Sequence, residues 1–296
     1  MIFKNAHIYR LNSALNITEE QLNNYLGEKA FIPCSGIRPS SFGWIQPLAE
    51  GGLAHEVSGC FLLCAKKEDK VIPSSALTDV LNEKIDRLET TESRPVRAKE
   101  KQNLKEDALA ELLPRALPKS KRIFGYISTF DDLVVVDTAS SSEAEIFLNH
   151  LRETLGSLKV IPPQVKYKPI DTYTHWLRYG KLPENFSLGD QCDLIDPEDS
   201  STANFRRQDL GTGEVRSHLD VGKICSKISL VWRGELKVSI DKDLTLRQIK
   251  LLSSNDSLEE EIDAVAKIDA AFVSMTLEFS RFLPDLFAAL GGETRS

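Results

Sequence analysis

The feature that most constrains the fold is a stripe of apolar residues near the end of the chain. Its members recur at steps of three or four, which places their side chains on one face of an α-helix. They are Leu258, Ile262, Val265, Ile268, Phe272, Met275, Phe279 and Phe282. Ser257 and Glu260 have the spacing of a capping box, and Pro284 is expected to kink or end the helix. The stripe therefore predicts a helix over 258–283, about 39 Å long at 1.5 Å per residue.

Elsewhere, predicted helices and strands occur in clusters, which is typical of an α+β fold. The run 57–72 is predicted to form two strands joined by a charged turn at 66–70. Helices beginning near Ser75 and Asn103 flank a basic connection at 92–102, and this pair is expected to form a protruding arm. Residues 123–137 are typical of a hairpin.

Three regions are expected from this pattern. A central α+β region would comprise 1–74 with 120–162, and 75–119 would be the helical arm. The segment 163–296 would be a β-rich region with the long C-terminal helix, in which Gly213 is expected at a turn.

Composition limits the class of protein. The 296 residues include 37 bases and 44 acids, a net charge of −7. No apolar run approaches the ~18 residues of a membrane span, and no secretory signal is visible. Five scattered cysteines do not form a disulfide framework, and Cys60 and Cys64 are expected to be buried and structural. We expect a cytoplasmic globular protein without membrane association.

The charge is distributed unevenly. Residues 253–293 carry all of the net −7, whereas 94–122 sum to +5 and 205–252 to +4. Because salt screens exposed charges beyond about 8–10 Å, a polyanion responds to these local patches more than to the total. Stacking aromatics are not interleaved with the bases, which favours duplex DNA bound through its phosphates, without sequence preference.

No catalytic site is evident. The chain has no phosphate-binding loop, dinucleotide fingerprint or nucleophile elbow, and no cofactor or metal is expected. One cluster of acids could hold Mg²⁺ for phosphodiester cleavage, but its spacing favours a solvated acidic loop. Its members are Asp190, Asp193, Asp196, Glu198 and Asp199.

Several collinear stretches make the chain resemble the bacterial recombination-associated RdgC family. They are Phe3-Lys4-Asn5, Tyr9-Arg10-Leu11, Phe31-Ile32-Pro33-Cys34, Gly43-Trp44, Cys64 to Lys70, Leu112 to Ala116, Leu151-Arg152, Leu155 to Leu158, Arg207 to Leu210, and Leu290 to Glu293. Their order and spacing extend from residue 3 to 293, so the resemblance covers essentially the whole chain.

The resemblance implies an elongated, multi-domain crescent subunit with an arm, which closes with a second copy into a ring-shaped homodimer. Duplex DNA would pass through a positively charged hole, and single-stranded DNA is a second potential ligand. The family is nucleoid-associated and antagonises RecA in recombination. In the family the arms meet through an aromatic residue after the Leu-Pro-Arg-Ala stretch. Here that position is Leu117, so a weaker aliphatic dimer contact is expected.

The same resemblance implies that Arg207 and Gln208 contact DNA. Charge alone adds further candidates, namely Lys66, Lys67, Arg97, Arg115, Lys119, Lys121, Arg122, Lys223 and Lys227. The acidic long helix is expected to face away from the DNA. A protein ring of this kind would block the access of the recombinase to the duplex without catalysing a reaction. Two alternatives stay open, a module that binds the recombinase directly and a metal-dependent nuclease using the acids at 190–199.

Overall fold

The computed structural model describes residues 3–36, 38–252 and 264–294. The chain divides into two compact units. The larger unit comprises residues 1–26, 46–63 and 124–296, and the smaller unit comprises 27–45 and 64–123. Helices and strands are mixed within the chain, which confirms the α+β class.

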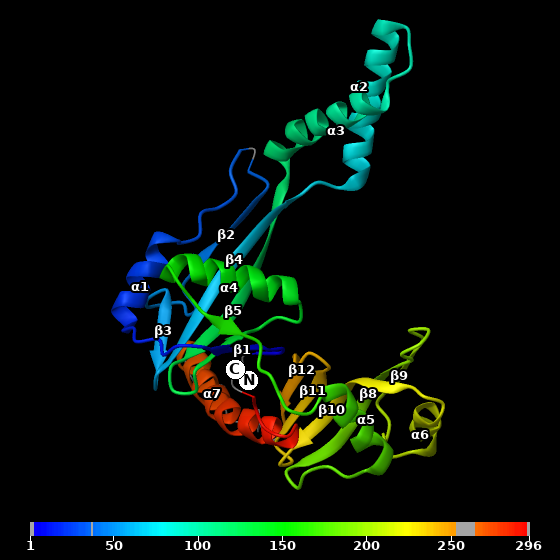
Figure 1. The fold of residues 1–296 in the computed structure, drawn as a ribbon. Coiled ribbons are helices and arrows are strands. Elements are labelled where there is room, and N and C mark those ends of the chain that lie inside the picture. Colours follow the sequence, from blue (N-terminus) through cyan, green and yellow to red (C-terminus); the bar gives the residue numbers. More distant parts are fainter. Residues whose placement is uncertain (1–2, 37, 253–263, 295–296) are drawn as a thin grey trace. The chain divides into compact units, whose positions relative to one another are not determined.

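Figure 1 shows the order of the elements along the chain. The strands are β1 (His7–Leu11), β2 (Ser40–Ile45), β3 (Ala54–Val57), β4 (Cys60–Val71), β5 (Leu117–Ser128), β6 (Leu133–Val136), β7 (Val160–Ile161), β8 (Phe186–Ile195), β9 (Thr202–Arg206), β10 (Ile224–Trp232), β11 (Leu236–Asp241) and β12 (Leu246–Leu251). The helices are α1 (Glu19–Glu28), α2 (Ser74–Glu92), α3 (Ala98–Leu112), the 3₁₀ turn η1 (Leu113–Arg115), α4 (Ser141–Leu155), α5 (Pro169–Tyr179), α6 (Gly213–Asp220) and α7 (Ala264–Ala289).

The strands form two sheets. The first has the order β2-β4-β5-β6-β1-β7, with β3 also paired to β4, and β4 and β5 each contribute to both units. The second is an antiparallel sheet in the larger unit, with the order β12-β11-β10-β8-β9. The predicted hairpin is confirmed as β5–β6, although β5 begins earlier, at Leu117.

Helix α7 supplies much of the core of the larger unit. Phe272 packs edge-on against Tyr126 of β5, with ring centroids 5.9 Å apart, and Phe282 packs edge-on against Trp232 of β10 at 5.7 Å. Phe272, Phe279 and Phe282 are completely buried, so the predicted apolar stripe is confirmed where it is described. The expected capping box at 257–260 and the start of the stripe lie outside the described residues.

The expected end of the helix at Pro284 is wrong, because α7 continues to Ala289. Proline removes one backbone hydrogen bond, but side-chain contacts hold the following turn in place. The Asp285 carboxylate accepts hydrogen bonds from Trp232 Nε1 at 2.8 Å and Asn185 Nδ2 at 3.0 Å. Leu286 beyond it is completely buried. Tertiary packing therefore outweighs the local preference of proline.

The expected charged turn at 66–70 is also wrong, because these residues lie inside the continuous strand β4. The actual turn is at Ser58-Gly59, where both residues have positive φ, and it joins β3 to β4. Helix α3 begins at Ala98 and not near Asn103, with the Glu100 side chain accepting from the Arg97 backbone N–H. The connection between α2 and α3 is therefore shorter than expected and consists of residues 93–97.

Two further differences concern the larger unit. The acids at 190–199 do not form a solvated loop throughout, because β8 extends from Phe186 to Ile195 and carries Asp190 and Asp193. Gly213 is the first residue of α6, a helix that the sequence analysis did not predict. In the described part of the chain, no helix has the length and apolar character required to cross a membrane.

Candidate nucleic-acid interface

The first half of β5 is unusual for a sheet strand, because Leu117 to Arg122 are all exposed. Side chains alternate between the two faces of a strand, so both faces meet solvent here. Lys119 and Lys121 lie on one face and Arg122 on the other. Among the described residues, neither Lys119 nor Arg122 forms an ion pair. This part of β5 therefore presents positive charge on both faces.

The smaller unit as a whole is basic. It contains sixteen Lys and Arg against twelve Asp and Glu, a net charge of +4. The larger unit contains the remaining 21 bases and 32 acids, a net charge of −11. A polyanion would thus be attracted to the smaller unit and repelled by much of the larger one.

Two candidate lysines lie on β4, and both have acidic neighbours. Lys66 Nζ is 3.2 Å from Glu68 and lies over the Phe31 ring, 4.5 Å from its centroid. Lys67 Nζ is 3.1 Å from Asp69. Successive residues of a strand point to opposite faces, so these two lysines cannot contact one ligand from the same side.

Glu68 organises this part of the smaller unit, although sequence reasoning did not single it out. Its side chain is 6% exposed, and it accepts hydrogen bonds from the Cys34 backbone N–H at 2.8 Å and from Ser120 Oγ at 3.0 Å. One carboxylate thereby joins β4 to β5 and to the segment before β2. The only sequence signal was an acid within a basic run, because its partners lie 34 and 52 residues away.

Low pH should weaken the hydrogen bonds that Glu68 accepts from Cys34 and Ser120. The hydrogen bond from the Cys34 N–H, helped by Ser120 and Lys66, lowers the pKa of Glu68 below its usual 4.5. A carboxylate with a lowered pKa stabilises the folded state above its unfolded pKa and loses that effect as the pH falls through the folded pKa. We expect the advantage of wild type over Glu68→Gln, measured by urea unfolding, to shrink as the pH falls below about 4.5. The Asp69→Asn variant is the control, because the neighbouring Asp69 side chain is 47% exposed. An equal pH dependence for both variants would contradict the assignment.

The helical hairpin α2–α3 carries further cations. Its two helices pack against each other, and of their residues only Ala108 is completely buried. Arg94 is bound by Glu100 at 2.7 Å, and this hydrogen bond lowers the pKa of Glu100 to about 2. Arg97 and Arg115, by contrast, are exposed and form no ion pair with another described residue. These two guanidinium groups are therefore available to an external anion.

The candidates in the larger unit differ in accessibility. Arg207 directly follows β9, is exposed, and has a positive φ of 55°. The Gln208 backbone N–H donates to Asp190 O at 3.3 Å, which ties this turn to β8. Because Arg207 is exposed just beyond the end of a strand and its guanidinium suits phosphate oxygens, it is well placed for a phosphate contact.

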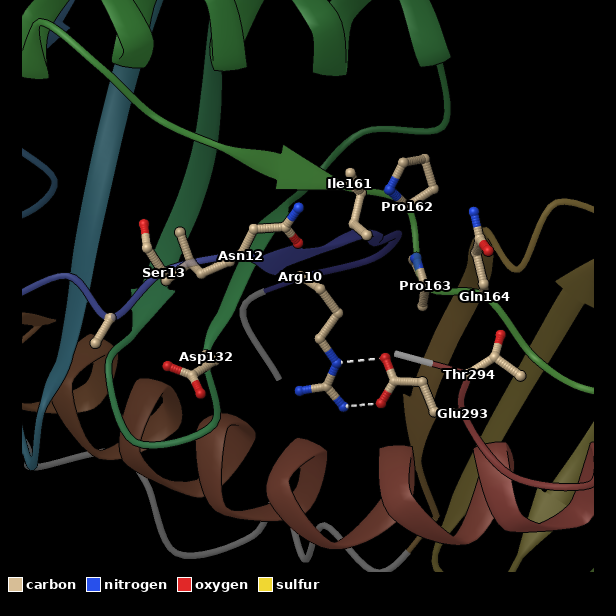
Figure 2. A pocket seen from close by; sticks show the side chains of 12 residues that line it. Arg10, Asn12, Ser13, Asp132, Ile161, Pro162, Pro163, Gln164, Glu293 and Thr294 are labelled. Carbon is tan, nitrogen blue, oxygen red and sulfur yellow. Dashed lines mark hydrogen bonds and ion pairs between the residues drawn. The ribbon is translucent and has the colours of Figure 1, made fainter. Parts of the chain in front are cut away.

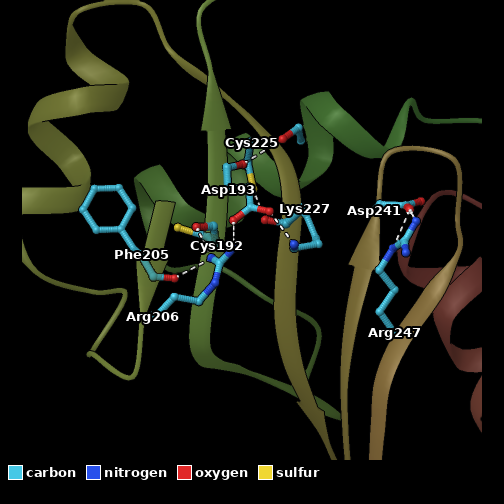
Figure 3. Close-up of polar contacts among 9 residues, drawn as sticks. Cys192, Asp193, Phe205, Arg206, Cys225, Lys227, Asp241 and Arg247 are labelled. Carbon is cyan, nitrogen blue, oxygen red and sulfur yellow. Dashed lines mark hydrogen bonds and ion pairs between the residues drawn. The ribbon is translucent and has the colours of Figure 1, made fainter. Parts of the chain in front are cut away.

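Lys223 and Lys227 both contact acids within the fold, and Figure 3 shows Lys227 beside Asp193. Lys227 forms an ion pair with Asp193, which also binds Arg206 at 2.5 Å. Lys223 Nζ donates to Ser201 O at 3.0 Å and lies 4.0 Å from Asp196, with 12% of its side chain exposed. Their charges are largely neutralised by neighbouring acids, so their contribution to DNA binding, still a prediction, should be smaller than that of Arg207.

A second polar feature is a pocket of about 310 Å³ beside β1 (Figure 2). Arg10 forms a bidentate ion pair with Glu293, at 2.6 Å and 2.7 Å, and also donates to Asp131 O. The guanidinium is thus satisfied by the chain itself. This pair attaches the C-terminal segment to β1 and leaves little capacity for an outside anion.

Comparisons with known proteins identify the family. A family model described as "Putative exonuclease, RdgC" matches residues 1–293. The chain belongs to the RdgC family. A curated relative from Aeromonas hydrophila is 39% identical over 303 residues, covering 100% of both chains. One from Pseudomonas aeruginosa is 37% identical over 303 residues, covering 99% of this chain and 98% of the relative, and one from Yersinia enterocolitica is 35% identical over 301 residues, covering 99% of each. All three are named Recombination-associated protein RdgC, and the predicted resemblance is confirmed.

In this RdgC-family chain, Asp190, Asp193 and Asp196 of the 190–199 segment each lie beside a basic side chain. Asp190 pairs with Lys237 at 2.8 Å, and Asp193 is bound by Arg206 and Lys227. Within 3–36, 38–252 and 264–294, no three His, Cys, Asp or Glu side chains are arranged to hold a metal ion. The carboxylates here neutralise basic neighbours across the second sheet.

Proposed function

We propose that this chain is a non-catalytic DNA-binding protein of recombination, which encircles duplex DNA as a ring-shaped homodimer of crescent subunits and limits strand exchange by RecA. The observation that carries the proposal is the exposed basic half of β5, in a unit whose net charge is +4. Exposed cations on both faces of a strand suit phosphate contacts, which position a duplex without reading its sequence. Relatives named for recombination support the biological setting.

The residues proposed to contact DNA differ in their expected contribution. Lys119, Lys121, Arg122 and Arg207 are the main contacts, because all four are exposed. Gln208, whose Nε2 is buried, is proposed as a weaker contact beside Arg207. Lys66, Lys67, Lys223 and Lys227 are secondary, because each already lies beside an acid. Arg97 and Arg115 are exposed and are proposed as further contacts from the helical hairpin and the turn after it. Leu117 is 80% exposed at the start of β5, and burial against a second copy would remove that large apolar surface from water. We therefore propose it as a dimer contact.

A protein that obstructs the recombinase needs only to occupy the duplex. A nuclease would need metal ligands or an activated nucleophile, and the paired carboxylates of β8 do not suit that role. Cleavage of duplex DNA in Mg²⁺ that is abolished by Asp193→Asn would overturn the non-catalytic proposal. A chain that binds the recombinase equally well without DNA would instead favour the interaction module.

Salt dependence tests the binding mode. If 6 to 10 phosphates are contacted, duplex affinity should fall about 10³- to 10⁵-fold between 50 and 200 mM salt. The decline should be the same for unrelated sequences, because phosphate contacts carry no sequence information. Fluorescence anisotropy with two duplexes of different base composition measures both.

Encirclement makes a separate prediction. Preformed complexes on a nicked circle should survive a salt challenge that strips the protein from linear duplex, because a closed ring can slide off only at an end. Equal lifetimes on the two substrates would contradict the proposed ring but would remain consistent with binding through phosphates.

A further inference from the structure

A groove of about 720 Å³ lies in the larger unit, and none of the residues proposed to contact duplex DNA lines it. Its lining comes from α5, from the segment 181–183 after it, and from Ala289 at the end of α7. Trp176, which is 4% exposed, belongs to the floor together with Leu182. The groove is therefore apolar at its base and open to solvent above.

Tyr167 presents an aromatic ring at this groove, and its position is fixed. The side chain is 54% exposed, although the Tyr167 backbone N–H donates to Leu290 O at 2.9 Å and the Lys166 N–H donates to Gly292 O at 3.0 Å. Its ring lies directly on Gly291, where an added Cβ would be 2.6 Å from the ring, and Gly291 also has a φ of +85°. One side of the ring is thus held against the chain, and Lys166 Nζ also lies over the ring, 5.7 Å from its centroid. The rest of the ring faces solvent.

A second ring pair lies on α5. His175, which lines the groove, packs against Tyr179, with centroids 4.7 Å apart and an angle of 50° between the planes. Both side chains are exposed, and Tyr179 is 58% exposed. Exposed aromatic rings that gather in one place mark an interaction site, whereas rings scattered singly do not. Tyr167 and His175 both line the groove, which points to a flat, stacking ligand.

The rim of the groove is positively charged. Lys166, Lys168 and Lys181 are exposed, and none of them forms an ion pair with another described residue. Asp171 is the one acid among the groove residues. Fixed rings surrounded by unpaired cations are the combination that proteins use to bind unpaired nucleotides, because every base has a face that can stack and every nucleotide has a phosphate.

We propose that this groove is a second nucleic-acid site, which binds single-stranded DNA by stacking an unpaired base on Tyr167 while the three lysines contact the neighbouring phosphates. The faces of paired bases are covered by their neighbours, so duplex DNA cannot use the rings. An acidic peptide would satisfy the lysines but would leave the ring faces without a matching group. The site goes beyond the proposed duplex function, and neither depends on the other.

The decisive variant is Tyr167→Ala, measured by fluorescence anisotropy with a labelled oligo-dT. Loss of one stacked base should weaken binding about 5- to 150-fold. Duplex affinity should be unchanged, so failure of this site is distinguishable from failure of the duplex proposal. Tyr25→Ala on α1 is the matched control, because Tyr25 is similarly exposed, at 45%, and lies outside the groove. Equal oligo-dT affinity for wild type and Tyr167→Ala would overturn the proposal.

Salt dependence tests the lysines. For single strands the slope of log K against log salt falls by about 0.7 per phosphate contact, so a Lys166→Gln/Lys181→Gln variant should reduce the slope by about 1.4. An unchanged slope would contradict their role.

Crosslinking locates the strand directly. Irradiation of an oligonucleotide containing 5-iododeoxyuridine should attach it to Tyr167, His175 or Tyr179. Adducts confined to other parts of the chain would overturn the site, as would full competition by a poly-glutamate peptide of equal charge. A change from dimer to monomer caused by Tyr167→Ala would show that a second copy covers the groove, which also contradicts the proposal.

Discussion

Replacing Lys119, Lys121 and Arg122 together with glutamine should lower the affinity for duplex DNA about 10²- to 10³-fold near 0.1 M salt. Each phosphate contact contributes about 0.9 to the slope of log K against log salt, so three lost contacts should reduce the slope by about 2.7. The side chains are exposed, so their replacement should leave the fold intact. Anisotropy titrations at several salt concentrations measure both quantities, and thermal unfolding verifies the fold.

A matched triple variant separates local contacts from net charge. Lys4, Lys159 and Lys250 are exposed in the larger unit and lie outside the proposed interface. Their replacement with glutamine removes the same total charge, yet it should change the slope little, because exposed charges are screened beyond about 8–10 Å. Equal losses in the two triple variants would mean that binding reflects total charge and that β5 makes no special contact.

The elements that could be predicted from sequence are those stabilised by neighbours along the chain. At the start of α1, for example, Thr18 and Gln21 have the Thr-x-x-Gln spacing of a capping box. The structure contains this box, since the Thr18 N–H donates to Gln21 Oε1 and the Gln21 N–H donates to Thr18 Oγ1. The stripe of α7 is another, because its period alone shows which side chains are buried. Such signals need no knowledge of the tertiary fold.

The errors have a common cause, which is the contribution of distant partners. The charged run at 66–70 is typical of a turn, yet Glu68 is bound by Cys34 and Ser120 and the run pairs with β2. Pro284 is typical of a helix end, yet Asp285 is bound by Trp232 and Asn185. Contacts across 34 to 100 residues decide both cases, and no local pattern encodes them.

The candidate interface shows the same limit. The run of charges along the sequence identified the basic half of β5. This half also lacks the alternating apolar residues that a buried strand face needs, which agrees with its exposure. The run of charges could not show that Lys223 and Lys227 are neutralised, since Asp196 and Asp193 lie about 30 residues earlier. Nor could it show the groove at α5, where Lys166 and Lys181 join Tyr167 only after folding. A count of charges gives the sign of a surface, whereas pairing decides which of those charges are available.

The largest expected loss of stability follows from Phe282→Ala in α7. The Phe282 side chain is completely buried between Trp232, with ring centroids 5.7 Å apart, and Phe186, at 6.3 Å. Removing a buried phenylalanine costs the transfer free energy of the ring and leaves a cavity, which together typically lower the free energy of unfolding by about 3–5 kcal/mol. Two aromatic contacts are lost as well, and each is worth about 0.5–1.5 kcal/mol.

Urea unfolding followed by tryptophan fluorescence measures this loss, because Trp232 is itself a partner of the deleted ring. Leu277→Ala is the control on the same helix, since Leu277 is 49% exposed and its truncation should change the free energy of unfolding by no more than about 0.5 kcal/mol. A loss below about 1 kcal/mol for Phe282→Ala would mean that α7 does not carry the core of the larger unit. The helix would then have to be held mainly by the Asp285 hydrogen bonds, and Asp285→Asn, which keeps the size of the side chain, would become the more damaging change.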